Sequence, residues 1–597
     1  MIARRLLLLV VTLLAIAVPA HPAQADRISI SELPLPPAAP SAAIGSCTTA
    51  INPHGTGCLG TIEGPGKLPD TRFVVVDVTF AGAPVGSVYT GAQTILIRTD
   101  GRRFPSGDPW KCLTCGTPDS HKAGLNPDIS TYPDGFPDGK RILIGANILD
   151  CAPYRVTDPA CTPDKVHIYP IRWNTTADGS GPGGGIRELR LNPDGVHLGW
   201  NHFVLTGTQY DEFGFMGRLV FDPAPTTGTP LTARYDLAAV TELFNPAPRY
   251  QPYVAKPGNR LVYNPAGMIG EFRGWSSDGR SALGIQSYES DSVDAFETSN
   301  ATGRSRPLTR HAEYVDPIRM SPDGRWTLAE ELAGTGRMDF MSAMEGIPPI
   351  TDQLPTTAHV SGLHDNGDRR FFLPYLVSTR TGRGVRLDYD GDPNWNARAD
   401  PSWLADGSGV VWSETMVTAP ACGGTNPLPC PVSHEPGGRT SRLLIARFPG
   451  RHSVHQVAPV PDTVAWGTPY TPGATLPVRP HLPAGTYTVS GKVRGSASVV
   501  ITENPRKIQV AYRNYSDDGS HIINGTESAA SVGPPYASTV TLHENLTLGG
   551  RRTGTKTTSE PGGLQMLPQV LASDWEATGT LTTTIDGRSY SQPANGT

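Results

Sequence analysis

Acidic, aromatic and arginine side chains are mixed at short spacing in two stretches of the chain. One stretch runs from residue 271 to 291 and the other from 311 to 337. Two carboxyl groups that flank a glycosidic oxygen can act as an acid and as a base or nucleophile. Aromatic rings stack on sugar faces, and a guanidinium can hold a uronate carboxylate through paired hydrogen bonds. We interpret the mixture as a carbohydrate-active site, against the plainer interpretation of a solvated rim with a few ion pairs.

The candidate residues fall into two groups by chemical role. The candidate catalytic carboxylates are Glu271, Glu289, Asp316 and Glu331. The candidate substrate-binding residues, which offer rings, charges or hydrogen bonds, are His202, Arg273, Trp275, Tyr288, Tyr314, Arg337, Asp400 and Glu414. The expected ligand is a small-molecule glycoside or an oligosaccharide.

Two histidines support a different reaction. His202 or His311 could serve as the base, or as a metal ligand, of a lyase that cleaves uronate oligosaccharides. Neither has a second ligand at the spacing of common metal motifs, so no cofactor is expected, while a structural or catalytic divalent cation stays an open alternative. A non-catalytic propeller that binds a glycan or a protein is the third alternative. The sequence has no G-x-S-x-G elbow and no P-loop, which argues against a serine hydrolase and a nucleotide-binding enzyme.

Recurrent Asp-Gly turns must position these residues. Proline fixes φ at the turn entry, aspartate caps the turn through its side chain, and glycine takes the position with φ above zero. An apolar run follows each turn and predicts the next strand. The turn aspartates are Asp138, Asp194, Asp278, Asp323 and Asp406.

The spacing of the turns indicates propeller blades. Successive turn aspartates are 56, 84, 45 and 83 residues apart. A repeat of about 42–45 residues accounts for one interval directly and for the two long intervals as two blades each. Six or seven blades fit this length, and seven is favoured.

The number of residues between each candidate and the aspartate of its turn shows which candidates occupy equivalent positions in different blades. Glu271 and Asp316 stand seven residues before a turn aspartate, and Asp400 stands six before one. In a blade whose turn joins the first strand to the second, these positions lie at the face opposite the turn. Polar residues also recur eight positions after the aspartate, at His202, Gln286, Glu331 and Glu414. We therefore expect both sets to meet at one mouth of the propeller, where ligand pockets form.

Two of the turns carry a family resemblance. Ser321-Pro-Asp-Gly-Arg-Trp326 and Trp275-Ser-Ser-Asp-Gly-Arg280 resemble the turn of the PD40, or TolB-like, β-propeller family. The resemblance covers residues 66–460 and implies a fold rather than an activity, because propellers host many chemistries.

The whole chain is also similar to secreted saponin hydrolases, through Cys112-Leu-Thr-Cys-Gly116, the Asp-Gly repeats and a β-rich tail containing Asn514-Tyr-Ser-Asp-Asp-Gly519. That similarity implies a hydrolase that removes a glucuronide-linked sugar chain from a triterpenoid aglycone.

Composition and local pattern divide the chain into five parts. With 66 Gly, 58 Pro and only 18% charged residues, the sequence is typical of a turn-rich, all-β protein. Net charge of −5 argues against a nucleic-acid partner. The predicted parts are a signal peptide (1–25), a flexible Pro/Ala-rich leader (26–46), the propeller (47–458), a Pro-rich linker (459–485) and a small antiparallel β domain (486–597).

The first 25 residues and the cysteines both predict export. Arg4 and Arg5 precede an apolar run that is too short to span a bilayer, and Ala23-Gln-Ala25 resembles a cleavage site. We expect a secreted monomer with no membrane span. In an oxidising compartment the eight cysteines are expected to form four local disulfides, Cys47–Cys58, Cys112–Cys115, Cys151–Cys161 and Cys422–Cys430, with a metal or redox role for Cys112 and Cys115 as an alternative.

Overall fold

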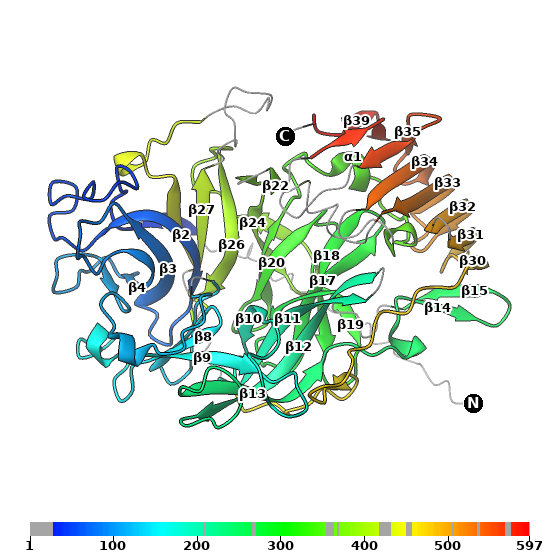
Figure 1. Ribbon diagram of the computed structural model, residues 1–597. Coiled ribbons are helices and arrows are strands. Elements are labelled where there is room, and N and C mark those ends of the chain that lie inside the picture. The colour runs from blue at the N-terminus through cyan, green and yellow to red at the C-terminus, as the bar shows by residue number, and fades with distance from the viewer. Residues whose placement is uncertain are drawn as a thin grey trace, which may run out of the picture.

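The computed structural model describes a β-propeller with a second sheet packed at its side (Figure 1). It describes residues 28–595 except 130, 207–208, 265–269, 354–362, 364, 367–368, 417–430, 449–456, 504–505, 534–537 and 567–574. The expected signal peptide and Cys422–Cys430 lie outside these residues. No helix in the described part of the chain is long and apolar enough to cross a membrane.

Six four-stranded blades form the propeller within the described residues. The first contains β2 (Cys58–Gly66), β3 (Phe73–Ala81), β4 (Gly91–Arg98) and β5 (Trp110–Cys112). The second contains β6 (Asp134–Gly135), β7 (Arg141–Ile144), β8 (Asn147–Asp150) and β9 (His167–Trp173). The third contains β10 (Arg187–Leu191), β11 (His197–Thr206), β12 (Gln209–Asp222) and β13 (Arg234–Glu242).

The remaining blades follow in chain order. The fourth contains β16 (Glu271–Trp275), β17 (Ser281–Glu289), β18 (Ser292–Ser299) and β19 (Ser305–Pro307). The fifth contains β20 (Val315–Met320), β21 (Trp326–Glu331), β24 (Leu373–Ser378) and β25 (Gly384–Arg386). The sixth contains β26 (Trp395–Trp403), β27 (Gly409–Met416), β28 (Ser441–Arg447) and β1 (Ser29–Leu33).

The first strand of each blade lies innermost. Strand β2 contacts β6 and β26, and β20 contacts β16 and β26, while β10 contacts β16. The second and third blades adjoin where the guanidinium of Arg190 lies over the Tyr132 ring at 3.8 Å. The outer strands of these two blades also pair in parallel, β9 with β13. The six inner strands therefore surround one axis.

Each predicted Asp-Gly turn joins the first strand of a blade to the second. The Asp278 carboxylate accepts hydrogen bonds from the Ser276 hydroxyl (2.7 Å) and the Arg280 amide (3.0 Å), while Gly279 adopts a φ of 73°. The first blade has the same turn without glycine, because the Asp70 carboxylate accepts from the Arg72 amide (3.2 Å). The sequence therefore contains a sixth turn that a search for Asp-Gly misses.

The described residues form six blades, and within them neither of the two long turn spacings contains two blades. The interval from Asp194 to Asp278 contains one set of outer strands and the hairpin β14 (Tyr253–Lys256) and β15 (Arg260–Tyr263). The interval from Asp323 to Asp406 contains an insertion between β21 and β24. That insertion includes α1 (Asp339–Ser342) and the hairpin β22 (Asp365–Asn366) and β23 (Arg369–Arg370).

The segment assigned to a flexible leader supplies the strand that closes the ring. β1 pairs antiparallel with β28, with Leu33 opposite Leu443, so the last blade contains strands from both ends of the propeller. Leu33 is buried with Ile445 and Leu404 in one apolar cluster. The structure therefore differs from the leader prediction at Ser29–Leu33. The strand is only five residues long and is followed by prolines, so its alternation is too brief to stand out in the sequence.

The C-terminal residues form an antiparallel sheet that packs against the fourth and fifth blades. Its strands are β30 (Gly485–Ser490), β31 (Arg494–Glu503), β32 (Arg506–Ser516), β33 (His521–Val532), β34 (Thr539–Gly550), β35 (Gly554–Thr558), β36 (Leu564–Met566), β37 (Ala577–Thr578), β38 (Leu581–Ile585) and β39 (Arg588–Ser591). The hairpin β14–β15 joins this sheet through β15 and β30. Lys556 is fully buried at the junction, and its ammonium lies 2.5 Å from the carboxylate of Asp291 in the fourth blade. Figure 1 shows this sheet in orange and red beside the green blades.

The Pro-rich connector also packs against the propeller. β29 (Thr468–Pro469) pairs with β13, and Asp462 accepts hydrogen bonds from His197 (2.9 Å) and Arg218 (2.8 Å). Short 3-10 turns complete the described chain, at η1 (Asp119–His121), η2 (Pro163–Lys165), η3 (Pro248–Tyr250), η4 (Thr351–Gln353) and η5 (Pro436–Gly438).

Three of the four expected disulfides lie in the described residues, and all three form. They join Cys47 to Cys58, Cys112 to Cys115 and Cys151 to Cys161. The sulfurs of Cys112 and Cys115 are therefore bonded to each other, and the metal alternative for this motif does not apply.

Leu33→Ala tests the closing strand. Loss of a buried leucine side chain should lower the free energy of unfolding by about 2–5 kcal/mol, measured by urea denaturation. Ser31→Ala is the matched control, because Ser31 is exposed on the same strand and keeps its backbone pairing with Ile445. If the two variants were equally stable, β1 would not be part of the folded blade.

Candidate active site

The guanidinium of Arg273, on β16, lies buried at the axis of the propeller. It contacts carboxylates from four blades. Its Nη1 donates to Glu188 (2.5 Å) and Glu271 (2.9 Å), while its Nη2 contacts Asp316 and lies 3.9 Å from Asp400. A buried charge is tolerated only when it is paired and hydrogen-bonded. The Arg273 cation meets that condition because the inner strands of four blades each bring a carboxylate to it.

Two further arginines surround Asp400. Nη2 of Arg190, on β10, lies 3.0 Å from the Asp400 carboxylate, and Nη2 of Arg319, on β20, donates to it at 3.1 Å. With the residues at the solvent-facing edge described next, these groups form the central ion cluster. Its members are Arg187, Glu188, Arg190, Glu212, Glu271, Arg273, Asp316, Arg319 and Asp400.

The cluster reaches solvent at Arg187, Glu212 and Glu271, which we call the mouth. The side chains of these residues are 41%, 19% and 13% exposed. Nη1 of Arg187 contacts Glu212 and lies 3.1 Å from Glu271, and its Nη2 lies 2.7 Å from Glu188. The Phe203 ring lies 5.0 Å from the same guanidinium. The mouth therefore presents a guanidinium held between carboxyl groups.

The environments of the three glutamates shift their pKa values in different directions. Burial alone would raise the pKa of Glu188, but the charges of Arg273, Arg187 and Arg190 outweigh burial and lower it to about 2. Burial raises the pKa of Glu271 to about 7, against the opposing charge of Arg273. Burial, together with repulsion from Glu271, raises the pKa of Glu212 well above its ordinary value. Glu188 is therefore a fixed anion, whereas Glu271 can exchange a proton near neutral pH and Glu212 keeps its proton to a higher pH than an ordinary glutamate.

Charge balance leads to the same conclusion. The central ion cluster contains four guanidinium groups and five carboxyl groups. One proton shared by Glu212 and Glu271 makes the cluster neutral, which is the favourable state for a buried group of charges.

The three glutamates are close enough for a divalent cation, because one oxygen from each lies within 4.8 Å of the others. Arg187 already contacts all three carboxylates. A guanidinium therefore occupies the position that a metal ion would take.

Four of the residues predicted from the sequence meet in this cluster, namely Glu271, Arg273, Asp316 and Asp400. Tyr314 lies at its edge, because its hydroxyl donates to Asp316 at 3.4 Å. Glu289 and Glu331 belong to a second acidic group between the fourth and fifth blades. Glu289 lies 3.9 Å from His311 and accepts the Gly346 amide at 3.1 Å. Burial, then Asp294 and Glu313, raise the pKa of Glu331 well above its ordinary value.

The other predicted binding residues lie apart from the mouth. Trp275 is buried in the core, and its indole donates to the Arg190 carbonyl (3.1 Å), so its ring does not face a ligand. Arg337 donates to the Leu363 carbonyl (2.8 Å). Glu414 accepts from Arg442 (2.7 Å) within the sixth blade.

Two more of the predicted residues pack within their own blades. His202 donates to the Gly185 carbonyl (3.1 Å), and burial lowers its pKa, so the imidazole is neutral at physiological pH. Tyr288 lies half-buried near Phe296, with 6.1 Å between the ring centroids.

The sequence analysis missed several members of the cluster, although its register could have found some of them. Arg187 stands seven residues before the turn aspartate Asp194, as Glu271 and Asp316 do before theirs. Tyr132, whose hydroxyl lies 3.3 Å from Glu188, stands six before Asp138. At the positions before the turn, only acidic residues were predicted as candidates. Glu188 likewise stands six before Asp194, the offset of Asp400 from Asp406, whereas Arg190, Glu212 and Arg319 stand at other offsets and have no such signal.

Comparisons with known proteins give propellers of low similarity. No family model matches the chain, and no curated protein matches its sequence. A TolB protein from Agrobacterium tumefaciens is 13% identical over 65% of this chain and 100% of its own, with a TM-score of 0.29. The propeller domain of the Trilobed protease from Pyrococcus furiosus is 8% identical over 68% of this chain and 95% of its own, with a TM-score of 0.20. At this similarity the propeller assignment rests on the blade topology, and no activity is transferred.

Arg273→Met tests the central ion cluster. The variant leaves Glu188 and Glu271 buried without their shared cation, which should lower the free energy of unfolding by roughly 3–5 kcal/mol at neutral pH. Loss of the cation raises the folded-state pKa of both carboxyl groups, and that of Glu271 already lies above the unfolded value. Their contribution is then present at low pH and is lost as the pH rises, so the deficit should be smaller at about pH 5 than at about pH 8.

The measurement is urea unfolding at the two pH values. Arg325→Met is the control, because Arg325 is 82% exposed in the Asp323 turn. A deficit for Arg273→Met that was independent of pH would contradict the cluster as described.

Proposed function

We propose that the protein is a secreted glycoside hydrolase whose catalytic pair is Glu212 and Glu271. The observation that carries the proposal is the arrangement of these two carboxyl groups on one guanidinium at the mouth, with raised pKa values and an ionised Glu188 behind them. Glycoside hydrolysis needs one carboxyl group protonated and one ionised at the working pH. A coupled pair that shares one proton meets that need.

The contacts of the pair suggest which member holds the proton. Glu271 accepts hydrogen bonds from both Arg187 (3.1 Å) and Arg273 (2.9 Å), which stabilise its ionised form. Glu212 shares only Arg187 with it and has the more strongly raised pKa. We therefore assign Glu271 as the nucleophile and Glu212 as the acid that protonates the departing glycosidic oxygen. Glu188 is a positioning residue, because its two oxygens are taken by Arg187, Arg273 and Asn201.

The spacing of the pair supports a retaining reaction. Carboxyl groups of retaining enzymes lie about 5–5.5 Å apart, whereas inverting enzymes leave about 6.5–9.5 Å for a water molecule. One oxygen of Glu212 and one of Glu271 lie within 4.8 Å of each other, so the two groups are close enough for the retaining geometry. Glu271 would form a glycosyl ester, and Glu212 would then activate the water that hydrolyses it.

The exposed guanidinium of Arg187 suggests an acidic sugar. Arg273 and Arg337, the arginines among the predicted substrate-binding residues, are both buried, whereas Arg187 is partly exposed beside the catalytic pair. A glucuronide-linked glycoside of the saponin type, as the resemblance to saponin hydrolases implies, would bring its carboxylate to this guanidinium.

Glu271→Gln and Glu212→Gln test the pair. Each should lower kcat by about 100- to 10,000-fold, because each removes a proton-transfer group or the nucleophile. Glu289→Gln and Glu331→Gln are matched controls from the second acidic group and should retain activity. Activity is followed by mass spectrometry with saponins, glucuronides and pectic oligomers.

The products of this screen separate the alternatives. Loss of activity in Glu289→Gln and Glu331→Gln, with full activity in the mouth variants, would move the site to the second acidic group. An unsaturated uronate product would indicate a lyase. Binding without any product would indicate a non-catalytic propeller.

The pH dependence of activity follows from the assigned protonation states. Glu271 must be ionised to act as the nucleophile, and its pKa is about 7. Below pH 7 kcat/KM should therefore rise about tenfold per pH unit, and it should fall at high pH when Glu212 loses its proton. The product should form with retained anomeric configuration, measured by proton NMR early in the reaction. An acid limb near pH 4, or inversion, would contradict the assignment.

A further inference from the structure

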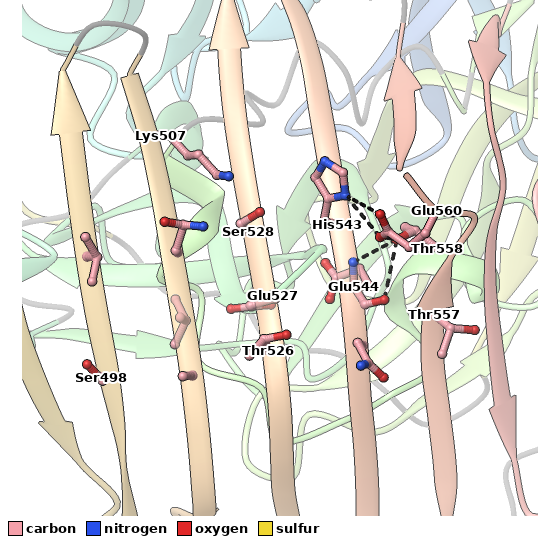
Figure 2. A pocket seen from close by; sticks show the side chains of 15 residues that line it. Ser498, Lys507, Thr526, Glu527, Ser528, His543, Glu544, Thr557, Thr558 and Glu560 are labelled. Carbon is pink, nitrogen blue, oxygen red and sulfur yellow. Dashed lines mark hydrogen bonds and ion pairs between the residues drawn. The ribbon is translucent and has the colours of Figure 1, made fainter. Parts of the chain in front are cut away.

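The outer face of the C-terminal sheet carries a groove that the propeller does not use. The groove has a volume of about 750 Å³ and spans β31 to β35. Figure 2 shows the side chains that line it, on five neighbouring strands. Residues on that face include Ser498, Gln509, Thr526, Ser528, Asn545 and Thr557.

Strand register places these side chains in two rows across the sheet. One row runs through Ser498, Ala511, Thr526, Asn545 and Thr557, which are direct neighbours on successive strands. A second, parallel row contains Gln509, Ser528 and His543. Neighbouring strands lie about 4.8 Å apart, so the first row extends roughly 20 Å.

Several hydrogen-bonding groups in the rows have no partner in the described part of the protein. Ser528 is 93% buried because its neighbours surround it, yet its hydroxyl forms no hydrogen bond with the described residues. The same holds for the side-chain amides of Gln509 and Asn545 at the groove surface. Ala511, in the middle of the first row, has no long side chain and leaves space above the sheet. The groove therefore offers neutral donors and acceptors around an open floor.

The charges at the groove favour a neutral ligand. Glu527 and Glu544 lie under the floor, and Glu560 lies at one end, where it accepts from His543 at 3.1 Å. Lys507 is the one cationic side chain of Lys or Arg type among the described lining residues. A nucleic acid or an acidic glycan needs a cationic surface, which a single lysine does not provide. A peptide that adds a strand needs a free sheet edge, whereas these strands are paired on both sides.

We propose that this groove binds a neutral oligosaccharide along the cross-strand rows. Its hydroxyl groups would pair with the amides of Gln509 and Asn545 and with the hydroxyls of Thr526 and Ser528. The site is separate from the mouth of the propeller and does not depend on the hydrolase proposal. It would hold the protein on a polysaccharide, whatever reaction the propeller performs.

The test uses the full chain with Glu271→Gln as background, so that no probe is cleaved. Cellohexaose, xylohexaose and mannohexaose are titrated by calorimetry, with hexagalacturonate as the acidic comparison. At least one neutral hexasaccharide should bind saturably, and more tightly than hexagalacturonate. Adding Gln509→Leu and Asn545→Leu should weaken that binding about tenfold or more, because both free amides are lost while side-chain size is kept.

Thr547→Val with Thr555→Val is the matched control. These two residues are exposed cross-strand neighbours on β34 and β35, beyond the groove lining, and the pair should leave binding unchanged. Thermal unfolding checks that all variants keep the fold. Three results would each overturn the proposal: no saturable binding of any neutral hexasaccharide, equal effects of the groove and control variants, or tighter binding of hexagalacturonate.

Discussion

The inner ring of the propeller depends on one buried guanidinium. Arg273 lies at the axis and contacts carboxylates from the third, fourth, fifth and sixth blades. Removing a charge from water costs several kcal/mol, so the ring is stable only when each of these strands brings its carboxylate to the axis. A slip of one residue in any inner strand would turn its carboxylate to the other face of the sheet. The buried charge thus selects a single register for four blades that have few direct backbone contacts with one another.

The chemistry at the mouth is a consequence of the same network. The three arginines buried with Asp400 and Glu188 pair with those carboxylates and hold them in position, and the remaining acidic excess falls on Glu212 and Glu271. These two residues lie where the cluster meets solvent, so they are the members that a proton and a substrate can both reach. A network that balanced its charges completely would hold the ring equally well, but it would leave no carboxyl group able to exchange a proton near neutral pH. The excess acid is therefore the feature that separates a structural cluster from a candidate active site.

Local signals in the sequence predicted the blades well and their number poorly. The Asp-Gly turns are determined by short-range contacts, such as the Ser276 and Arg280 bonds to Asp278, so they are visible in a single sequence. The register also placed Glu271, Asp316 and Asp400 of the first strands close together, because a fixed number of residues before the turn corresponds to a fixed height along the propeller axis. Two insertions are each about as long as a blade, and the spacing of the turns alone does not distinguish such an insertion from a blade. Leu33 pairs with Leu443, more than 400 residues away, and Glu212 reaches Arg187 from a third strand; neither contact has a local signature.

A second buried cation, Lys556, fixes the position of the C-terminal sheet against the propeller. Burial opposes the charge on Lys556, but Asp291 and Glu544 outweigh it and raise the pKa of Lys556, so the ammonium stays charged. Asp291 comes from the turn between β17 and β18, whereas Lys556 and Glu544 come from the sheet, so the ion pair crosses between the two parts of the molecule. Such a contact allows little sliding, because displacement by one residue would leave a buried charge unpaired. The outer groove is on the opposite face of the same strands and is therefore held at a fixed position relative to the fourth blade, which also contributes Glu271 to the mouth. Lys556 thus joins the sheet that carries the groove to the fourth blade, and Arg273 joins the fourth blade to its neighbours at the axis. A polysaccharide bound along the groove and a glycosidic bond at the mouth would therefore lie at fixed positions relative to each other.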